Sequence, residues 1–279
     1  MRLLLANDDG IGAPGLVAME SALRSEFSDL GAELELLVVA PSHEQSAVAH
    51  GISLYRDISI EDLGDGHYAV GGTPADCVKV ALNHLWKDRK PDVVVAGINR
   101  GQNVGTCVLY SGTVAAAMEA AMCGVPSVAV SLAFLDVFML ADDDKERPAL
   151  FEQLSVMARS PEEYAYAARF GASVCRQVSE RGLPFGTVLN VNVPFLPEEE
   201  IRGVHVCAMS DAWFSDTFRQ SENGSWRNIG SSMVPGSGDR VYDDHALEQH
   251  RSIAVTPLQF DMTSYRFLPQ LESWFDDRH

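Results

Sequence analysis

Two adjacent carboxylates stand near the start of the chain, where the first apolar run stops. The sequence MRLLLANDDG places Asp8 and Asp9 directly after residues 2–6, a short run bounded by polar turn residues. Such a run is typical of a buried strand in a parallel sheet. Neighbouring carboxylates repel each other unless a cation or a shared proton compensates them. The pair therefore predicts a site for a hard divalent cation, with a turn rich in Asn, Asp and Gly as the alternative.

Two later segments also follow apolar runs and carry oxygen donors. Residues 41–50 (PSHEQSAVAH) contain Ser46, which a turn by itself would also explain, and residues 97–105 (GINRGQNVG) contain Asn99 and Asn103. The carboxyl ends of parallel strands meet at one edge of a sheet, which is where open α/β sheets bind their ligands. We therefore expect these segments to lie at the same rim as the carboxylate pair.

A helix start follows the glycine-rich loop. Ser111, Gly112 and Thr113 precede the alanine-rich run 114–122. Free backbone N–H groups and the helix dipole make such a start an anion site, with a plain N-cap as the alternative. The glycine spacing fits neither a Walker loop nor a dinucleotide fingerprint, so phosphate is favoured over NAD. A cation held by oxygen donors alone, Mg²⁺, Mn²⁺ or Ca²⁺ rather than zinc, beside an anion site indicates phosphoryl chemistry.

Strand and helix signals alternate over residues 1–194. This alternation predicts an α/β fold with a Rossmann-like three-layer core and a mainly parallel sheet. Residues 188–193 (VLNVNV) are expected to be the last core strand. The pattern breaks over residues 133–160, and the acidic run 142–144 within them indicates an exposed insertion.

The composition of the sequence changes after residue 194. Residues 195–279 are polar and rich in Gly and Ser around two apolar stretches, 204–208 and 253–256, that are typical of strands. They predict a smaller β-rich arm and tail, with a short helix over 267–275. Because an isolated hairpin is marginally stable, we expect this arm to serve oligomerisation.

Composition excludes several classes of protein. The formal net charge of −18 argues against a partner such as a nucleic-acid polymer, whose phosphates are neutralised by Lys and Arg. No apolar stretch has the length of a membrane span, and the N-terminus lacks a signal-peptide pattern. Five cysteines without C-x-x-C spacing indicate reduced thiols. We therefore expect a cytoplasmic protein without a membrane partner.

A set of motifs resembles the SurE family of survival proteins in order and spacing. They are NDDGIGAPGL, VVAPSHEQSA, GTPADCVKVAL, GINRGQNVG, YSGTVAAAMEA, PSVAVSL, VLNVNVP and AVTPLQFDMT. The resemblance implies a metal-dependent 5′/3′-nucleotidase, a phosphomonoesterase that hydrolyses nucleoside 5′- and 3′-monophosphates and, in some members, short polyphosphate. It also implies a homodimer or homotetramer whose C-terminal arm is exchanged between subunits.

The family's site residues are carried over only where the motifs match. The resemblance implies one divalent ion, Mg²⁺ or Mn²⁺, with Ca²⁺ as a further ion that the site would accept in crystals. Asp8 and Asp9 would assist deprotonation of the attacking water. The implied metal ligands are Asp8, Asp9, Ser46 and Asn99, and the implied phosphate-binding residues are Asn99, Asn103, Ser111, Gly112 and Thr113.

Two departures from the family pattern leave the substrate preference open. Thr106 and Cys107 stand where the family usually has two aspartates in GDDV, and residues 225–230 (SWRNIG) match a family motif only loosely. One alternative is a catalytically altered nucleotide- or phosphate-binding module on the same fold. A dinucleotide or nucleotide-sugar enzyme is a third, which rests on fold analogy alone.

Overall fold

The computed structural model describes residues 1–28, 31, 33–135, 156–221, 223–237 and 240–275. The acidic run 142–144 and most of the expected insertion lie outside these ranges.

A nine-stranded sheet forms the centre of the molecule, in the order β3-β4-β2-β1-β5-β6-β7-β11-β8. The strands are β1 Arg2–Ala6, β2 Glu35–Pro41, β3 Ile60–Gly64, β4 His67–Val70, β5 Val93–Arg100, β6 Ser127–Ala133, β7 Thr187–Pro194, β8 Val204–Val206 and β11 Ile253–Gln259. From β4 to β7 all neighbours are parallel, whereas β3 is antiparallel to β4 and β11 is antiparallel to β7. The prediction of a mainly parallel α/β sheet is confirmed.

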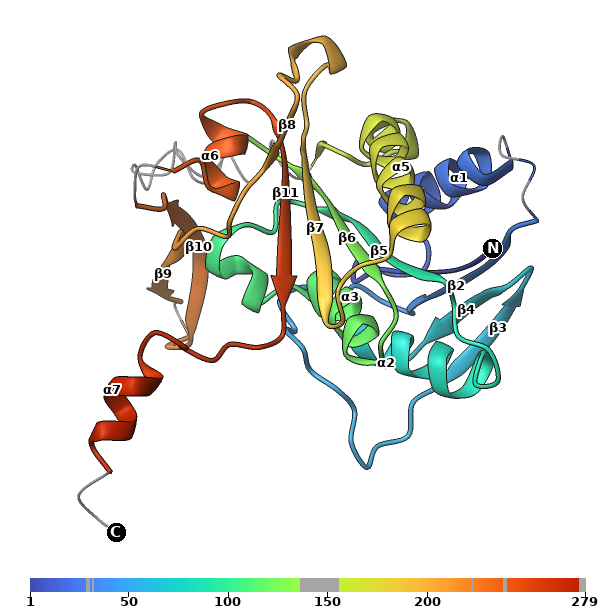
Figure 1. Ribbon diagram of the computed structural model, residues 1–279, viewed down its shortest axis with the longest axis horizontal. Helices are drawn as coiled ribbons and strands as arrows, with labels where there is room; N and C mark the ends of the chain where they lie inside the picture. The colour runs from blue at the N-terminus through green and yellow to red at the C-terminus, as the bar shows by residue number, and fades with distance from the viewer. Residues whose placement is uncertain (29–30, 32, 136–155, 222, 238–239, 276–279) are drawn as a thin grey trace.

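Helices cover both faces of this sheet (Figure 1). One face carries α1, Pro14–Ser28, and α5, Ala165–Arg181; the other carries α2, Pro74–Val80, and α3, Gly112–Met122. Side chains of β1 alternate between the two cores: Leu3 and Leu5 join the first cluster and Leu4 joins the second. Because both faces are covered, β1 is apolar throughout, and the three-layer expectation is confirmed.

The expectation that residues 188–193 form the last core strand is wrong. β11 pairs with β7 from Thr187 to Asn192, and β8 pairs with β11, so both apolar stretches expected in the arm extend the main sheet. The pairing joins segments about sixty residues apart, and local periodicity carries no information about such a partner.

The remaining C-terminal elements lie outside that sheet. They are the antiparallel hairpin of β9, Trp213–Gln220, and β10, Trp226–Val234; the helix α6, Asp243–Glu248; and the helix α7, Leu268–Ser273. The loosely matched motif 225–230 therefore lies largely in β10. Figure 1 shows α7, the expected short tail helix, projecting away from the body.

The chain order reverses between β1 and β5, which are neighbours in the sheet. From β1 the chain proceeds to β2 on one side, whereas β5 leads to β6 on the other. A crevice forms outside the carboxyl ends of strands at such a switch point. Asp8 and Asp9 follow β1, and Asn99 lies at the end of β5, so the topology brings the predicted ligands to this point.

Gly97 allows β5 to lie close to β6 just before this rim. Its φ is +131°, and a Cβ there would lie 2.3 Å from the Val130 carbonyl oxygen. We expect Gly97→Ala to lower the free energy of unfolding by about 2 kcal/mol or more, measured by urea denaturation. Gly12→Ala, whose Cβ would meet nothing within 4 Å, is the matched control. Equal losses of unfolding free energy in both variants would contradict this explanation.

Candidate metal and phosphate site

Asp8 is buried at the end of β1, with 5% of its surface exposed. The turn that holds it is closed by Asn7, whose side-chain amide donates to the Gly10 carbonyl at 2.8 Å and whose oxygen accepts from the Gly10 N–H at 3.3 Å. The Asp8 carbonyl accepts from the N–H of Gln45 at 2.8 Å, which joins the loop after β2 to the same point. Two of the predicted rim segments are thus brought together.

The N-terminus of α3 lies directly against Asp8. The hydroxyl of Thr113, which is fully buried, donates to Asp8 Oδ1. A Cβ on Gly112 would lie 2.8 Å from Asp8 Cβ, so only glycine permits this approach. Burial raises the pKa of Asp8, and hydrogen bonds from the hydroxyl and N–H of Thr113 oppose that rise. Thr113, expected to bind phosphate, therefore orients the carboxylate in this structure.

The remaining groups at this helix start are placed for an anion. Ser111 is the N-cap of α3, and its Oγ accepts from the Val114 N–H at 3.1 Å. The N–H of Gly112 has no acceptor within the described parts of the chain. A free N–H on the first turn of an eleven-residue helix is a donor for a phosphate oxygen.

Asp9 bridges the switch point to β5. Its Oδ2 accepts from the backbone N–H of Arg100 at 3.2 Å. Burial, followed by the charge of Asp8, raises the pKa of Asp9 to about 7, and the nearby Glu44 adds to the same rise. Two desolvated carboxylates of like charge are stabilised in ionised form by a cation between them. The carboxylate pair therefore fits a divalent metal ion.

The other two expected metal ligands, Asn99 and Ser46, differ in their hydrogen bonds. The side-chain amide of Asn99 donates to the Gly101 carbonyl at 2.7 Å, which leaves its oxygen as the atom suited to a cation. Ser46 is exposed, and its hydroxyl donates to Glu44. Among the described residues, no group of three His, Cys, Asp or Glu side chains is arranged to hold a metal ion. Hydroxyl or amide oxygens would therefore have to complete a set of metal ligands built on the carboxylate pair.

Asn103 lies in a buried amide network. Its side-chain nitrogen donates to Ser131 Oγ at 2.8 Å, and its N–H donates to the side-chain oxygen of Asn192 at 2.7 Å. The side chains of Asn190 and Asn192 both donate to its carbonyl. These contacts fix the glycine-rich loop to β6 and β7. The direct phosphate contact expected for Asn103 stays a prediction.

Thr106 and Cys107, which depart from the family pattern, face the C-terminal segment. The N–H and hydroxyl of Thr106 both donate to the Ala212 carbonyl, at 2.8 and 2.9 Å. Burial and the nearby Asp243 raise the pKa of Cys107 to about 12, so its thiol is inert at neutral pH. An aspartate at position 107 would add a second carboxylate beside buried Asp243.

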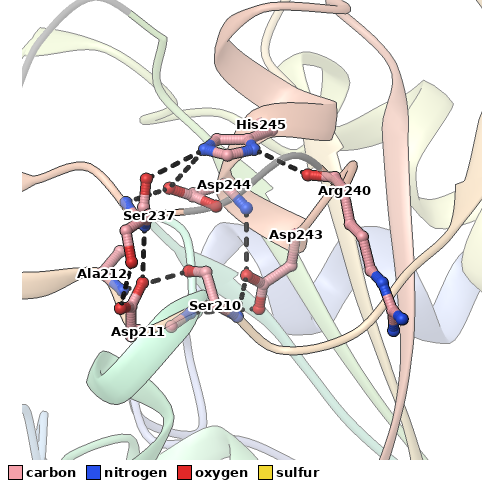
Figure 2. A network of polar contacts seen from close by, with 10 residues as sticks. Ser210, Asp211, Ala212, Ser237, Arg240, Asp243, Asp244 and His245 are labelled. Carbon is pink, nitrogen blue, oxygen red and sulfur yellow. Dashed lines mark hydrogen bonds and ion pairs between the residues drawn. The ribbon is translucent and has the colours of Figure 1, made fainter.

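Asp243 ties this turn to the rest of the C-terminal segment. One carboxylate oxygen accepts from the Gly105 N–H at 3.0 Å and the other from the Ser210 N–H at 2.9 Å. Figure 2 shows Asp243 beside the contacts of Asp244 with His245 and of Asp211 with Ser237. The turn before α3 is therefore held by residues far along the chain.

The site expected from the sequence did not include an ion-pair cluster around the buried carboxylate of Glu119. Glu119 of α3 is 4% exposed and contacts His50 Nε2 at 2.9 Å and Lys79 Nζ at 2.7 Å. His50 belongs to the loop that carries Ser46, and Ala47 and Ala49 in that loop have φ of 56° and 53°. Such conformations cost of order 1 kcal/mol each and persist where surrounding contacts hold them. The lone acidic residue in an alanine-rich helix was the available signal.

Asp9→Asn removes one of two like charges from the carboxylate pair. In EDTA at pH 7.5 we expect the variant to be more stable than the parent by about 2 kcal/mol, because the pair is desolvated and self-repelling. Added Mn²⁺ should raise the thermal midpoint of the parent and change that of the variant less. Calorimetry with and without metal measures both, and a variant less stable than the parent in EDTA would contradict the proposed pairing.

Glu119→Gln tests the ion-pair cluster. Burial raises the pKa of Glu119, but the hydrogen bonds and charges of His50 and Lys79 outweigh it, and the net pKa is lowered from 4.5. A lowered pKa stabilises the fold above the unfolded value and loses that effect as pH falls through the folded value.

We expect Glu119→Gln to lower the free energy of unfolding by about 2 kcal/mol at pH 7, because the carboxylate loses its charge-assisted hydrogen bonds to the partly exposed His50 and Lys79. The difference from the parent should narrow below pH 4.5 in urea titrations, with exposed Glu61→Gln as the control. A difference that is constant with pH would show that the charge of Glu119 is not what stabilises the cluster.

Comparisons with known proteins agree with the fold. The model of the family described as survival protein SurE matches residues 3–216. The 5′-nucleotidase SurE of Pelobacter propionicus is 40% identical over 277 residues, which cover 98% of this chain and 99% of that protein. The 5′-nucleotidase SurE of Geotalea daltonii is 38% identical over 277 residues, with 98% and 99% covered.

A solved structure agrees over the full length. The crystal structure of the SurE protein from Aquifex aeolicus has a TM-score of 0.73 at 28% sequence identity, and the match covers 99% of this chain and 100% of that chain. With the family model matching most of the chain, this protein belongs to the SurE family of survival proteins.

Proposed function

We propose that this protein is a metal-dependent 5′-nucleotidase that hydrolyses nucleoside monophosphates to nucleoside and phosphate. The observation that carries the proposal is the contact between Asp8 and the first turn of α3, which sets a cation-binding carboxylate beside an anion-binding helix start. The names of the relatives, 5′-nucleotidase SurE, support the same activity. Hydrolysis of 3′-monophosphates and of short polyphosphate is a finer part of this proposal.

The proposed metal ligands are Asp8, Asp9, Asn99 and Ser46. A divalent cation, Mg²⁺ or Mn²⁺ in this proposal, supplies the Lewis acidity that polarises the phosphoryl group and activates water. Ser46 would turn from Glu44 toward the pair to complete the set. Asp8 is held by Thr113, so its carboxylate serves to fix the geometry of the site.

Asp9 is the group that we assign to proton transfer. Its Oδ2 accepts a hydrogen bond from the Arg100 N–H, and the carboxylate, ionised beside the cation, would take the proton from the attacking water. The N–H of Gly112 would donate to an equatorial oxygen of the phosphoryl group, where negative charge concentrates in the transition state. Asn99, Asn103 and Ser111 complete the proposed phosphate-binding set.

The alternative is a binding module that keeps the fold without turnover. One observation on the sequence favours it, namely Thr106 and Cys107 at the positions of the family's two aspartates. Both residues contact the C-terminal segment, so their replacement leaves the Asp8 and Asp9 pair in place. This favours the enzyme over the binding module.

The division into a core, 1–194, and an arm, 195–279, also stays a proposal, in which β8 and β11 of the arm complete the sheet of the core. Within the second part, the hairpin β9–β10 and the projecting helix α7 lie outside the main sheet. We propose that they join subunits into a dimer or tetramer. Among the described residues no helix is long and apolar enough to cross a membrane. A cytoplasmic location is part of the proposal.

Phosphate release from 5′- and 3′-nucleoside monophosphates tests the activity. We expect EDTA to abolish release and Mn²⁺ or Mg²⁺ to restore it. Asp8→Asn should lower kcat by a factor of about 10³ or more while circular dichroism stays unchanged, because the cation loses a ligand. Tight nucleotide binding without phosphate release by folded parent protein would favour the binding module, and full activity of Asp8→Asn would remove the carboxylate pair from the mechanism.

A further inference from the structure

A small polar cavity lies at the same rim, beside the carboxylate pair. Its volume is about 250 Å³, and its wall includes Gln45, Arg56, Asp57 and Ile58 from the loop after β2. Residues 71–73, after β4, form the opposite wall. Since β4, β2 and β1 are parallel neighbours, the cavity and the carboxylate pair open at the carboxyl ends of adjacent strands.

Two contacts connect the cavity with Asp8. Gln45, on one wall, donates its N–H to the Asp8 carbonyl at 2.8 Å. Thr73, on the other wall, precedes Pro74, whose Cγ would lie 3.1 Å from a Cβ on Gly112. Gly112 in turn abuts Asp8. A phosphate bound at the start of α3 is therefore separated from each wall of the cavity by a single residue. This residue is Asp8 on the side of Gln45 and Pro74 on the side of Thr73.

The cavity walls are fixed by a buried carboxylate. Asp76 is 4% exposed, and its Oδ1 accepts from the Ser53 N–H on the loop wall while its Oδ2 accepts from the Thr73 N–H, both at 2.9 Å. The Thr73 hydroxyl also donates to the Gly51 carbonyl at 2.6 Å. His50, bonded to buried Glu119, anchors the same loop further along α3. The cavity is thus preformed.

The lining has both hydrogen-bond donors and acceptors. Arg56 and Asp57 are exposed side chains at the wall, and Ile58 supplies an apolar surface beside them. A carboxylate accepts from ribose hydroxyls or ring N–H groups, and a guanidinium donates to ring nitrogens or carbonyls. Apolar surface with a few placed polar groups is what a heterocycle attached to a sugar requires.

We propose that this cavity is the nucleoside subsite and that Arg56 and Asp57 determine specificity for the nucleoside part of the substrate. The inference rests on the proposed nucleotidase function and adds to it the residues that distinguish a nucleotide from a simple phosphate ester. The phosphoryl group is held at Asp8 and α3, and the nucleoside extends from there toward β4.

The test compares two substrates that share the phosphoryl group. We would measure kcat/KM for 5′-AMP and for methyl phosphate in the parent, Arg56→Met and Asp57→Ala; the methyl group is too short to reach the cavity from the phosphate position at α3. We expect each variant to lose at least about tenfold for 5′-AMP, as the loss of a hydrogen bond to a charged group does, and less than about twofold for methyl phosphate. Exposed Asp88→Ala, outside the cavity, should change neither.

The outcomes separate the subsite from the activity. Equal losses on both substrates, or no loss on either, would overturn the subsite. If the parent releases phosphate from neither substrate, the nucleotidase proposal fails, and saturation-transfer NMR with millimolar adenosine then tests the cavity by itself. A signal in the parent that weakens in both variants supports the subsite, and its absence in the parent overturns it.

Discussion

The carboxylate of Asp8, buried against the first turn of α3, is the constraint on which the rest of the rim depends. Its position requires glycine at residue 112, a hydroxyl from Thr113 and the turn closed by Asn7. It also places a second carboxylate, Asp9, in a desolvated position of like charge. This arrangement is unfavourable without a cation, and such strain at a binding site is relieved by the ligand that the site is built to hold.

Three segments at this rim are each fixed by a buried polar side chain from another part of the chain. Asp76 holds the loop after β2, Asn192 holds the loop after β5, and Asp243 holds the turn before α3. A buried carboxylate or amide needs several hydrogen bonds to offset its desolvation. Backbone N–H groups of irregular loops need acceptors for the same reason. Each pairing therefore satisfies both the buried side chain and the loop backbone, and it makes the rim rigid.

The charge of the chain and the charge of the proposed substrate have the same sign. At a net charge of −18 the protein repels a phosphate monoester at long range. Attraction must therefore be local, and the start of α3 and a divalent cation at the carboxylate pair supply it over short distances where screening is weak.

The sequence by itself determined the parallel α/β core and the segments that meet at its rim, because apolar runs ending in polar residues are a local signal of buried strands. It also pointed to Asp8, Asp9 and Asn99 by position. Tertiary structure decided which strands complete the sheet, since β11 pairs with β7 across a long separation. It also decided that Thr113 orients Asp8 and that Glu119 anchors a distant loop, because burial and hydrogen-bond partners arise only when segments far apart in the chain are packed together.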